Sequence, residues 1–235
     1  MTKLSKQNKK SYVSVVYSEE RAPKTDYPSK LVTYLMDRFD LKTGERLLEI
    51  GCGRGDFLLA FHNAGLKCSG VDKEKTSITL PADLDVKQCD ISQESLPFKD
   101  NTFDVVYHKS LIEHLYDPGG LMDETYRVLK PGGIVIILTP DWASQTKVFY
   151  EDFTHSRPYD TTALKDLLQI KGFSNVNTEL FYQLPVIWHL PFLKILSKLL
   201  QLILSTPTAR KLTELTKIKF IRWSVELMVL GYSEK

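Results

Sequence analysis

The sequence predicts an α/β fold with a largely parallel sheet. Short apolar runs alternate with helical patterns along most of the 235 residues, and a glycine-rich turn directly follows the first of these runs. Such alternation is typical of βαβ units, in which a helix connects each strand to the next parallel one. The length is sufficient for one domain of this kind with an insertion.

The secondary structure elements are expected in a regular order after a polar N-terminal segment, residues 1–28. A helix is predicted over Ser29–Phe39, because apolar residues recur there at helical spacing. The predicted strands are Arg46–Ile50, Lys67–Val71, Val86–Gln88, Phe103–His108, Ile134–Thr139 and Val176–Tyr182. The helices between them are predicted at Asp56–Asn63, Gly119–Val128 and Thr162–Lys171, and a last apolar strand is predicted at Ser224–Gly231.

Composition and charge restrict the function classes. The N-terminus is polar and basic with no apolar run behind it, which argues against a secretory signal. The three cysteines are scattered (Cys52, Cys68, Cys89), so no metal site is indicated and a reducing, cytoplasmic location is favoured. Residues 186–222 carry seven Lys or Arg and one acid, whereas residues 11–185 are net acidic. A basic surface confined to one segment does not favour a nucleic-acid-binding protein.

The strongest chemical signal is the turn after the first predicted strand, Glu49-Ile-Gly-Cys-Gly-Arg-Gly55. Glycine lacks a Cβ, so the backbone adopts a positive φ and approaches a ligand closely. The N-terminus of the helix that follows favours a negative group nearby. Several nucleotide-binding folds use such a loop, so the residues at the neighbouring strand ends decide among them.

Carboxylates follow the next two predicted strands. Asp72 ends the second strand, where an acid accepts hydrogen bonds from a ribose diol. Asp90 follows the third strand, where a carboxylate accepts from an adenine amino group. A nicotinamide-binding oxidoreductase is the alternative, but the glycine spacing is Gly-x-Gly-x-Gly and not Gly-x-Gly-x-x-Gly.

Together these motifs resemble the class I S-adenosylmethionine-dependent methyltransferases, especially the branch that acts on small molecules, lipids or glycans. The likeness covers roughly residues 30–182 and the last strand. It implies a Rossmann-like, doubly wound sheet with a reversed seventh strand, in a domain spanning residues 29–235. It also implies a helical insertion at about residues 184–219, between strands six and seven. The matching segments are Glu49–Gly55, Asp72, Asp90-Ile91, Phe103-Asp104, Glu113–Leu115 and Leu129–Gly133.

The resemblance implies S-adenosylmethionine as cofactor and S-adenosylhomocysteine as product. Glu49, Gly51 and Gly53 would then line the methionine part. Asp72 would hold the ribose, and Asp90 and Ile91 would face the adenine. His108 would lie near the transferred methyl group. The residues expected to bind the cofactor are Glu49, Gly51, Cys52, Gly53, Asp72, Lys73, Asp90, Ile91 and His108.

The segment after the fifth predicted strand contains Asp152-Phe-Thr-His155, and related methyltransferases often carry an Asp-x-x-His there. His155 is the predicted general base, with Asp152 as its orienting partner. The alternative is that both residues tie down a loop or cap the helix near Thr161. Trp142 and Tyr150 are candidates for an acceptor pocket or for the core.

The predicted reaction is O-methylation of a small-molecule, lipid-linked or glycan acceptor. N- or C-methylation on the same scaffold is the nearest alternative. A catalytically silent subunit that binds S-adenosylmethionine and assists a partner is the alternative from another class, because motifs that bind a cofactor do not prove turnover.

The predicted insertion contains an amphipathic helix over residues 191–205, with a broad apolar face and a narrow polar stripe. Four roles are open for it. It packs on the domain's own core, forms a lid over an apolar acceptor, pairs with a second copy in a homodimer, or rests on the inner face of a membrane. Basic side chains that would suit anionic headgroups are Lys194, Lys198, Arg210, Lys211, Lys217, Lys219 and Arg222.

Overall fold

The computed structural model describes residues 15, 23–74, 81, 82 and 84–235, so most of the predicted N-terminal segment lies outside the described residues. A seven-stranded sheet has the order β3-β2-β1-β4-β5-β7-β6. The first five strands are parallel, and β7 is antiparallel to both neighbours, which confirms the predicted reversed strand. The strands are β1 (Arg46–Ile50), β2 (Lys67–Asp72), β3 (Asp85–Gln88), β4 (Phe103–Lys109), β5 (Leu129–Pro140), β6 (Ser174–Phe181) and β7 (Met228–Glu234).

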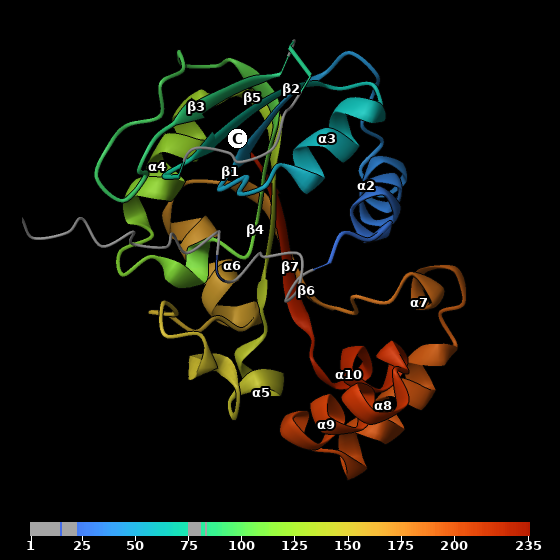
Figure 1. Cartoon of the computed structure of the whole chain (residues 1–235). Helices are drawn as coiled ribbons and strands as arrows, with labels where there is room; N and C mark the ends of the chain where they lie inside the picture. The colour runs from blue at the N-terminus through green and yellow to red at the C-terminus, as the bar shows by residue number, and fades with distance from the viewer. Residues whose placement is uncertain (1–14, 16–22, 75–80, 83) are drawn as a thin grey trace, which may run out of the picture.

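Helices cover both faces of the sheet (Figure 1). Helices α2 (Tyr27–Arg38) and α3 (Asp56–Asn63) cover one face, and α4 (Gly119–Val128) and α6 (Thr161–Ile170) cover the other. Along β4, Val105 and Tyr107 belong to the core under α2 and α3, whereas Val106 belongs to the core under α4 and α6. Strands buried on both faces read as continuous apolar runs, which is why they were predictable.

Short elements follow the carboxyl ends of β4 and β5. They are η1 (Ile112–His114), α5 (Trp142–Gln145) and η2 (Phe149–Glu151). Since parallel strands end at one edge of the sheet, these elements lie at the same edge as the glycine loop that follows β1.

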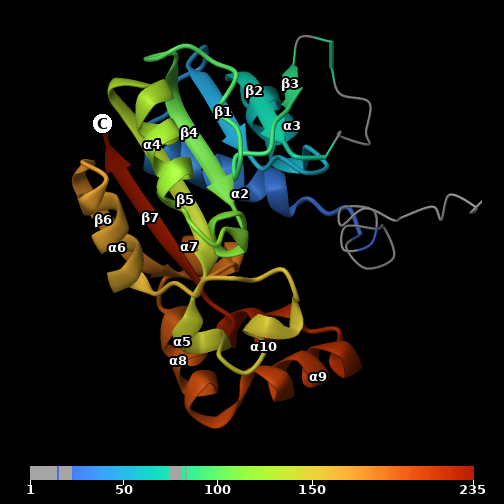
Figure 2. The same ribbon diagram turned by 90° about the vertical axis from the view of Figure 1, so that its left-hand side faces the viewer.

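The insertion between β6 and β7 consists of α7 (Pro185–His189), α8 (Leu193–Ile203), α9 (Thr206–Thr216) and α10 (Lys219–Val225). It lies beyond the carboxyl end of β5, because β7 begins where Met228 pairs with Pro140 (Figure 2). The predicted start of the last strand at Ser224 is wrong, since that residue belongs to α10. The run was read as a strand because it is apolar, but it coils into a helix that packs on α8.

Helix α8 reverses the usual amphipathic arrangement, because a polar side chain is buried and large apolar side chains are exposed. Ser197 is fully buried, and its hydroxyl is hydrogen-bonded to that of Ser224 at 2.9 Å. The Gln201 side chain donates to the Ser224 carbonyl at 2.7 Å. The apolar side faces outward instead, with Ile195 and Leu202 exposed by 66% and 81%. Ser197 and Gln201 of the polar stripe therefore face the domain, whereas Lys194 and Lys198 are exposed. The exposed apolar side chains contradict packing of the whole apolar face on the domain's own core.

No helix in the described ranges combines the length and apolar character needed to cross a bilayer.

Candidate functional site

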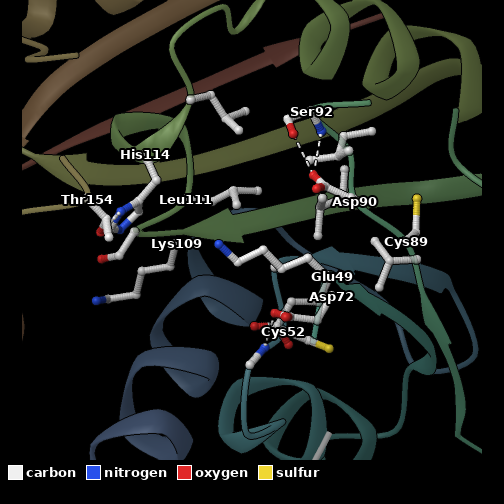
Figure 3. Close-up of a pocket in the computed structure, with 18 of the residues that line it drawn as sticks. Glu49, Cys52, Asp72, Cys89, Asp90, Ser92, Lys109, Leu111, His114 and Thr154 are labelled. Atoms are coloured by element: carbon white, nitrogen blue, oxygen red, sulfur yellow. Dashed lines mark hydrogen bonds between the residues drawn. The ribbon is translucent and has the colours of Figure 1, made fainter. Parts of the chain in front are cut away.

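A cavity of about 440 Å³ lies at the carboxyl ends of β1, β2 and β4. Its floor is the glycine loop after β1, and its walls come from the segments that follow the other strands (Figure 3). This is the edge at which open α/β sheets bind ligands, and the volume suits a small molecule.

The glycine loop has the backbone that the sequence predicted. Gly51, Gly53 and Gly55 all have positive φ, at 73°, 50° and 82°. A Cβ on Gly51 would lie 2.9 Å from Leu111 Cδ1, so the loop and the segment after β4 are in close contact there. The Gly53 amide donates to Asp72 Oδ2 at 2.8 Å, which fixes the loop against the end of β2.

Glu49 is a buried acid on the cavity wall. Its side chain is 3% exposed, and Oε2 has no hydrogen-bond partner within the described part of the chain. Burial, together with the charges of Asp56 and Asp72, raises the pKa of Glu49 well above its usual value. A cationic ligand group would relieve this unfavourable environment, because it would neutralise the charge and donate a hydrogen bond.

Asp72 and Asp90 lie at the same cavity. Asp72 Oδ1 accepts from the Glu74 amide at 2.8 Å, so both of its oxygens are oriented by the backbone. Asp90 Oδ1 accepts from the amide and hydroxyl of Ser92 at 3.1 and 2.6 Å. A carboxylate oxygen has two lone pairs, so both acids retain acceptor capacity toward a ligand.

The structure places all but one of the predicted cofactor residues on this cavity. Cofactor binding by each of them stays a prediction. The residues it brings together are Glu49, Gly51, Cys52, Gly53, Asp72, Lys73, Asp90 and Ile91.

His108 is the exception. Side chains alternate along a strand, so His108 points to the same face as Val106, under α4 and α6. It is fully buried away from the cavity, and burial lowers its pKa to about 3. The next residue, Lys109, lines the cavity instead, and burial lowers the pKa of its ammonium group while Glu113 and Glu49 oppose this. Sequence reasoning missed Lys109, although strand alternation could have found it.

The far end of the cavity is lined by polar groups from η1 and from the loop after η2. His114, Thr154 and Ser156 lie there, together with the exposed Tyr116. The loop is held to η1 by the Ser156 amide, which donates to the Glu113 carbonyl at 2.8 Å. From the sequence, His114 was a weaker candidate for the general base and was expected beside the cofactor pocket, whereas Tyr116, Thr154 and Ser156 had been assigned no role because they meet His114 only in the fold.

His155 is not among the residues that line the cavity, but its ring centroid lies 4.8 Å from that of His114. Its Nδ1 is hydrogen-bonded to the Phe149 carbonyl at 2.7 Å. The Asp152 carboxylate accepts from the amide and hydroxyl of Thr154, at 3.0 and 2.6 Å, and so ties down the loop. The role of His155 as general base stays a prediction.

Contacts also show where other residues near His155 lie. Helix α6 is capped by Asp160, whose Oδ1 accepts from the Ala163 amide at 2.8 Å. Trp142 and Tyr150 do not line the cavity, and both pack edge-on against Phe149, with ring centroids 5.4 and 5.1 Å away.

Comparison with known proteins identifies the family. A family model described as a methyltransferase domain matches residues 18–178, which is more than half of the chain. The chain belongs to this methyltransferase family. The sheet order and the reversed β7 of this methyltransferase are those of the class I, S-adenosylmethionine-dependent enzymes, as predicted.

Curated relatives match the same region of the methyltransferase. It is 32% identical over 160 residues to phosphoethanolamine N-methyltransferase 3 of Arabidopsis thaliana, covering 61% of this chain and 32% of the relative. It is 30% identical over 158 residues to phosphoethanolamine N-methyltransferase of Triticum aestivum, covering 61% of this chain and 31% of the relative. This chain therefore spans about a third of the length of these relatives.

Solved structures share the fold. Phosphoethanolamine N-methyltransferase 2 of Haemonchus contortus, with phosphomonomethylethanolamine and S-adenosylhomocysteine, matches 94% of this chain and 58% of its own with a TM-score of 0.61 and 20% identity. An S-adenosylmethionine-dependent methyltransferase from Archaeoglobus fulgidus matches 94% of this chain and 98% of its own, with a TM-score of 0.62 and 21% identity.

The cavity fits the cofactor of this family, S-adenosylmethionine. The unpartnered Oε2 of Glu49 suits the ammonium group of its methionine part. Gly53 exposes open space where a side chain would stand, since nothing lies within 4 Å of a Cβ built there. Asp72 and Asp90 supply acceptors for hydroxyl and amino groups at the neighbouring strand ends.

Proposed function

We propose that this methyltransferase transfers a methyl group from S-adenosylmethionine to a small polar acceptor. The proposal rests on one observation: two different kinds of side chain line the same cavity. The acids Glu49, Asp72 and Asp90 line one end, and the polar groups Lys109, His114 and Thr154 line the other. Such a cavity holds two reactants side by side, which is the main protein contribution to a displacement reaction.

Two acids of the cavity wall position the cofactor in this proposal. Glu49 binds the ammonium group of the cofactor, and Asp72 binds its ribose. When bound, the cofactor supplies a methyl carbon on a positively charged sulfur, which a lone pair of the acceptor attacks in line. Apolar side chains of Ile50 and Leu111 help to exclude water from the cavity.

A nitrogen acceptor is the first candidate. The matched relatives from two plants are named as phosphoethanolamine N-methyltransferases. The ammonium group of Lys109 at the acceptor end favours a substrate that carries an anionic group, such as a phosphate. An oxygen acceptor, such as a hydroxyl group of a lipid or glycan, is the second candidate. The Asp-x-x-His segment that ends in His155 favours it.

Calorimetric titration tests the cofactor part. S-Adenosylmethionine and S-adenosylhomocysteine should bind in the micromolar range, and NADH should not. Asp72→Ala should weaken both sulfur ligands at least about tenfold, the equivalent of one hydrogen bond to a charged group. Asp85→Ala, which alters an exposed acid at the start of β3, is the matched control. Absence of binding by either sulfur ligand would overturn the proposal.

Transfer itself is tested with cofactor labelled in the methyl group. Phosphoethanolamine, ethanolamine, catechols, sugars and lipid extracts would be offered separately, and the methylated atom identified by mass spectrometry. Cofactor binding without transfer to any of them, even after a lysate of the source organism is offered, would favour the silent-subunit alternative.

We further propose that the outer surface of α8 and α9 rests on an anionic membrane surface at the cytoplasmic face of the inner membrane. Large apolar side chains point outward along this surface, and exposed lysines flank them. Each lysine near such a surface contributes about 1 kcal/mol. The exposed apolar residues are Phe192, Ile195, Leu196, Leu199, Leu202, Ile203, Leu215 and Ile218, and the exposed lysines are Lys194, Lys198, Lys211, Lys217 and Lys219.

The two arginines of the insertion are engaged internally and do not belong to this surface. Arg210 Nε and Arg222 Nε bind the buried Glu226 carboxylate at 2.5 and 3.0 Å, and Arg210 also pairs with Glu151. The lysines thus carry the proposed contact with headgroups.

Liposome flotation tests this contact. The protein should bind vesicles that contain phosphatidylglycerol and not vesicles of phosphatidylcholine alone. Leu199→Glu combined with Leu202→Glu should abolish binding, whereas Glu214→Gln should not reduce it. Failure of the intact protein to bind would overturn the membrane proposal. Concentration-dependent dimerisation in sedimentation experiments that the double variant removes would assign the face to a second copy instead.

A further inference from the structure

Three metal-ligating side chains converge beside the cavity. One carboxylate oxygen of Glu113 and one ring nitrogen each of His114 and His155 lie within 4.8 Å of one another. Glu113 and His114 belong to η1 after β4, and His155 lies in the loop after η2. Sequence spacing indicated no metal site, because the fold alone brings the third ligand to the other two.

The hydrogen bonds of His114 determine which ring nitrogen carries a proton. Asp152 Oδ1 lies 2.6 Å from the Thr154 hydroxyl, and an ionised carboxylate only accepts, so Thr154 donates to it. Thr154 Oγ1 must then accept from His114 Nδ1, which lies 2.8 Å away. The neutral imidazole of His114 is thereby fixed as the tautomer with its lone pair on Nε2.

The same reasoning applies to His155. Its Nδ1 lies 2.7 Å from the Phe149 carbonyl, which only accepts, so Nδ1 is the protonated nitrogen and Nε2 holds the lone pair. Histidines that bind metals almost always donate their other N–H to a carbonyl or a carboxylate in this way.

Glu113 completes the set with a buried carboxylate. The residue is fully buried, and Oε2 accepts from Thr139 Oγ1 at 2.9 Å. Oε1 has no hydrogen-bond partner among the residues that the structure describes. A buried carboxylate oxygen without a donor is costly unless a cation or a proton compensates it.

We propose that Glu113, His114 and His155 bind a divalent transition-metal ion, with zinc as the favoured ion. Two imidazoles and one carboxylate are a ligand set of zinc sites that keep an open position, and also of non-haem iron sites. Magnesium is disfavoured because it prefers an all-oxygen environment. Zinc–ligand bonds of about 2.0–2.1 Å require donors about 3.3 Å apart, so side-chain rotation draws the three groups together on binding.

The open position gives the site a ligand class. His114 and Thr154 line the acceptor end of the cavity, so an ion on His114 is accessible from that end (Figure 3). An oxygen of the acceptor, from a hydroxyl or a phosphate group, completes the coordination and is thereby oriented. The proposed metal site depends only on the three side chains that would bind the ion. Its role toward the acceptor rests in addition on the proposed methyl transfer.

Metal binding and general base catalysis exclude each other at His155. Both use the lone pair on Nε2, and a ligated imidazole cannot accept a proton there. Metal binding at His155 would therefore exclude the general-base role that the sequence predicted for it.

The test uses the full chain without a polyhistidine tag, stripped with a chelator. Cobalt(II) is added first as a spectroscopic probe, and zinc is then titrated in competition. We expect one cobalt ion per chain, visible absorption bands of a four- or five-coordinate site, and displacement by zinc. Glu113→Gln and His155→Ala should each weaken zinc at least 100-fold. Thr154→Val, which removes the hydroxyl that links His114 to Asp152, should weaken it about 10–100-fold.

His189→Ala is the matched control, because His189 is exposed on α7 and far from the cluster in the sequence. Binding of S-adenosylhomocysteine is measured on the Glu113, His155 and His189 variants and reports folding, since none of these three residues lines the cavity. A wild-type chain that binds no cobalt or zinc, or a His155→Ala chain that binds zinc as tightly as His189→Ala, overturns the proposal. Zinc binding without S-adenosylhomocysteine binding would instead overturn only the proposed function.

Discussion

Ser197 of α8 and Ser224 of α10 form a hydrogen bond of 2.9 Å between two hydroxyl groups that are both fully buried. Together with the bond from Gln201 to the Ser224 carbonyl, it holds this side of α8 against α10. Ser197 faces the domain, whereas Leu199 and Leu202 lie on the outside, 54% and 81% exposed. An exposed apolar surface of this kind marks a contact with another molecule.

A double-mutant cycle at this pair should show strong coupling. Ser197→Ala leaves the Ser224 hydroxyl buried without its side-chain partner, so the free energy of unfolding should fall by about 1–3 kcal/mol. Ser224→Ala should have a similar effect. The double variant should be less destabilised than the sum of the two, because no unsatisfied hydroxyl remains. Urea denaturation measures all four chains, and strictly additive effects would contradict the buried bond.

The sequence predicted the parallel half of the fold well because local rules decide it. Strand β1 and helices α3 and α4 have the predicted bounds, since each lies between turn residues and carries one clear periodicity. Periodicity also predicted an amphipathic helix at α8. It could not predict which side faces inward, because Ser224, the buried partner of Ser197, lies 27 residues further along the chain.

Some residues of the site were likewise predictable from local sequence, and others were not. Glu49, Asp72 and Asp90 were predictable because each lies at or directly after a strand end, where the fold places ligands. His108 does not line the cavity, because the prediction used the strand end and neglected side-chain alternation, which places Lys109 there instead. The cluster of Glu113 and His155 was not predictable, because the two residues are far apart in the sequence and meet only through η1 and the loop after η2.

The glycine loop should show a specific cost of a side chain at Gly51. Both Gly51 and Gly132 have positive φ, at 73° and 75°, so alanine at either position should cost about 1–2 kcal/mol of stability. Only at Gly51 would the new Cβ meet a side chain, Leu111, across the floor of the cavity. Gly51→Ala should therefore weaken S-adenosylhomocysteine at least tenfold in calorimetry, whereas Gly132→Ala should bind it like the wild type. Equal affinities in the two variants would remove Gly51 from the cofactor site.

Acid stability should depend on Glu124. Its Oε1 and Oε2 accept from Arg127 Nε and Nη2 at 2.8 and 2.7 Å, and Oε2 also accepts from the Leu96 amide at 2.6 Å. These bonds lower the pKa of Glu124 below its ordinary value of 4.5, the hydrogen bond with Arg127 being the largest cause. The ionised carboxylate thus stabilises the fold above pH 4.5, and this stabilisation is lost as the pH falls through the lowered pKa of Glu124.

Glu124→Gln should accordingly reduce the free energy of unfolding by about 1 kcal/mol at pH 7. The difference from wild type should shrink as the pH falls below 4.5. Thermal denaturation between pH 3 and pH 7 measures it, and Asp123→Asn, on the same helix but 63% exposed, is the control. A difference that stays constant over this range would mean that the charge of Glu124 has no role.

Glu49 should show opposite effects on stability and on binding. Its carboxylate is buried and near Asp56 and Asp72, so its pKa is raised well above the usual value, mainly by burial. A group with a raised folded-state pKa favours the protonated fold at low pH and destabilises the fold as rising pH ionises it. Glu49→Gln removes that ionisation. The ligand-free variant should therefore be more stable than wild type, and the gain should grow from pH 5 to pH 8.

The same substitution removes the anionic partner proposed for the cofactor's ammonium group. S-Adenosylhomocysteine should bind at least about tenfold more weakly, since a hydrogen bond to a charged group contributes about 1.5–3 kcal/mol. Urea denaturation at several pH values and calorimetry measure the two effects, with Glu214→Gln, an exposed acid on α9, as control. A variant that gains stability but keeps full affinity would place the ammonium group elsewhere. A variant that loses both would show that Glu49 holds the loop and does not contact the ligand.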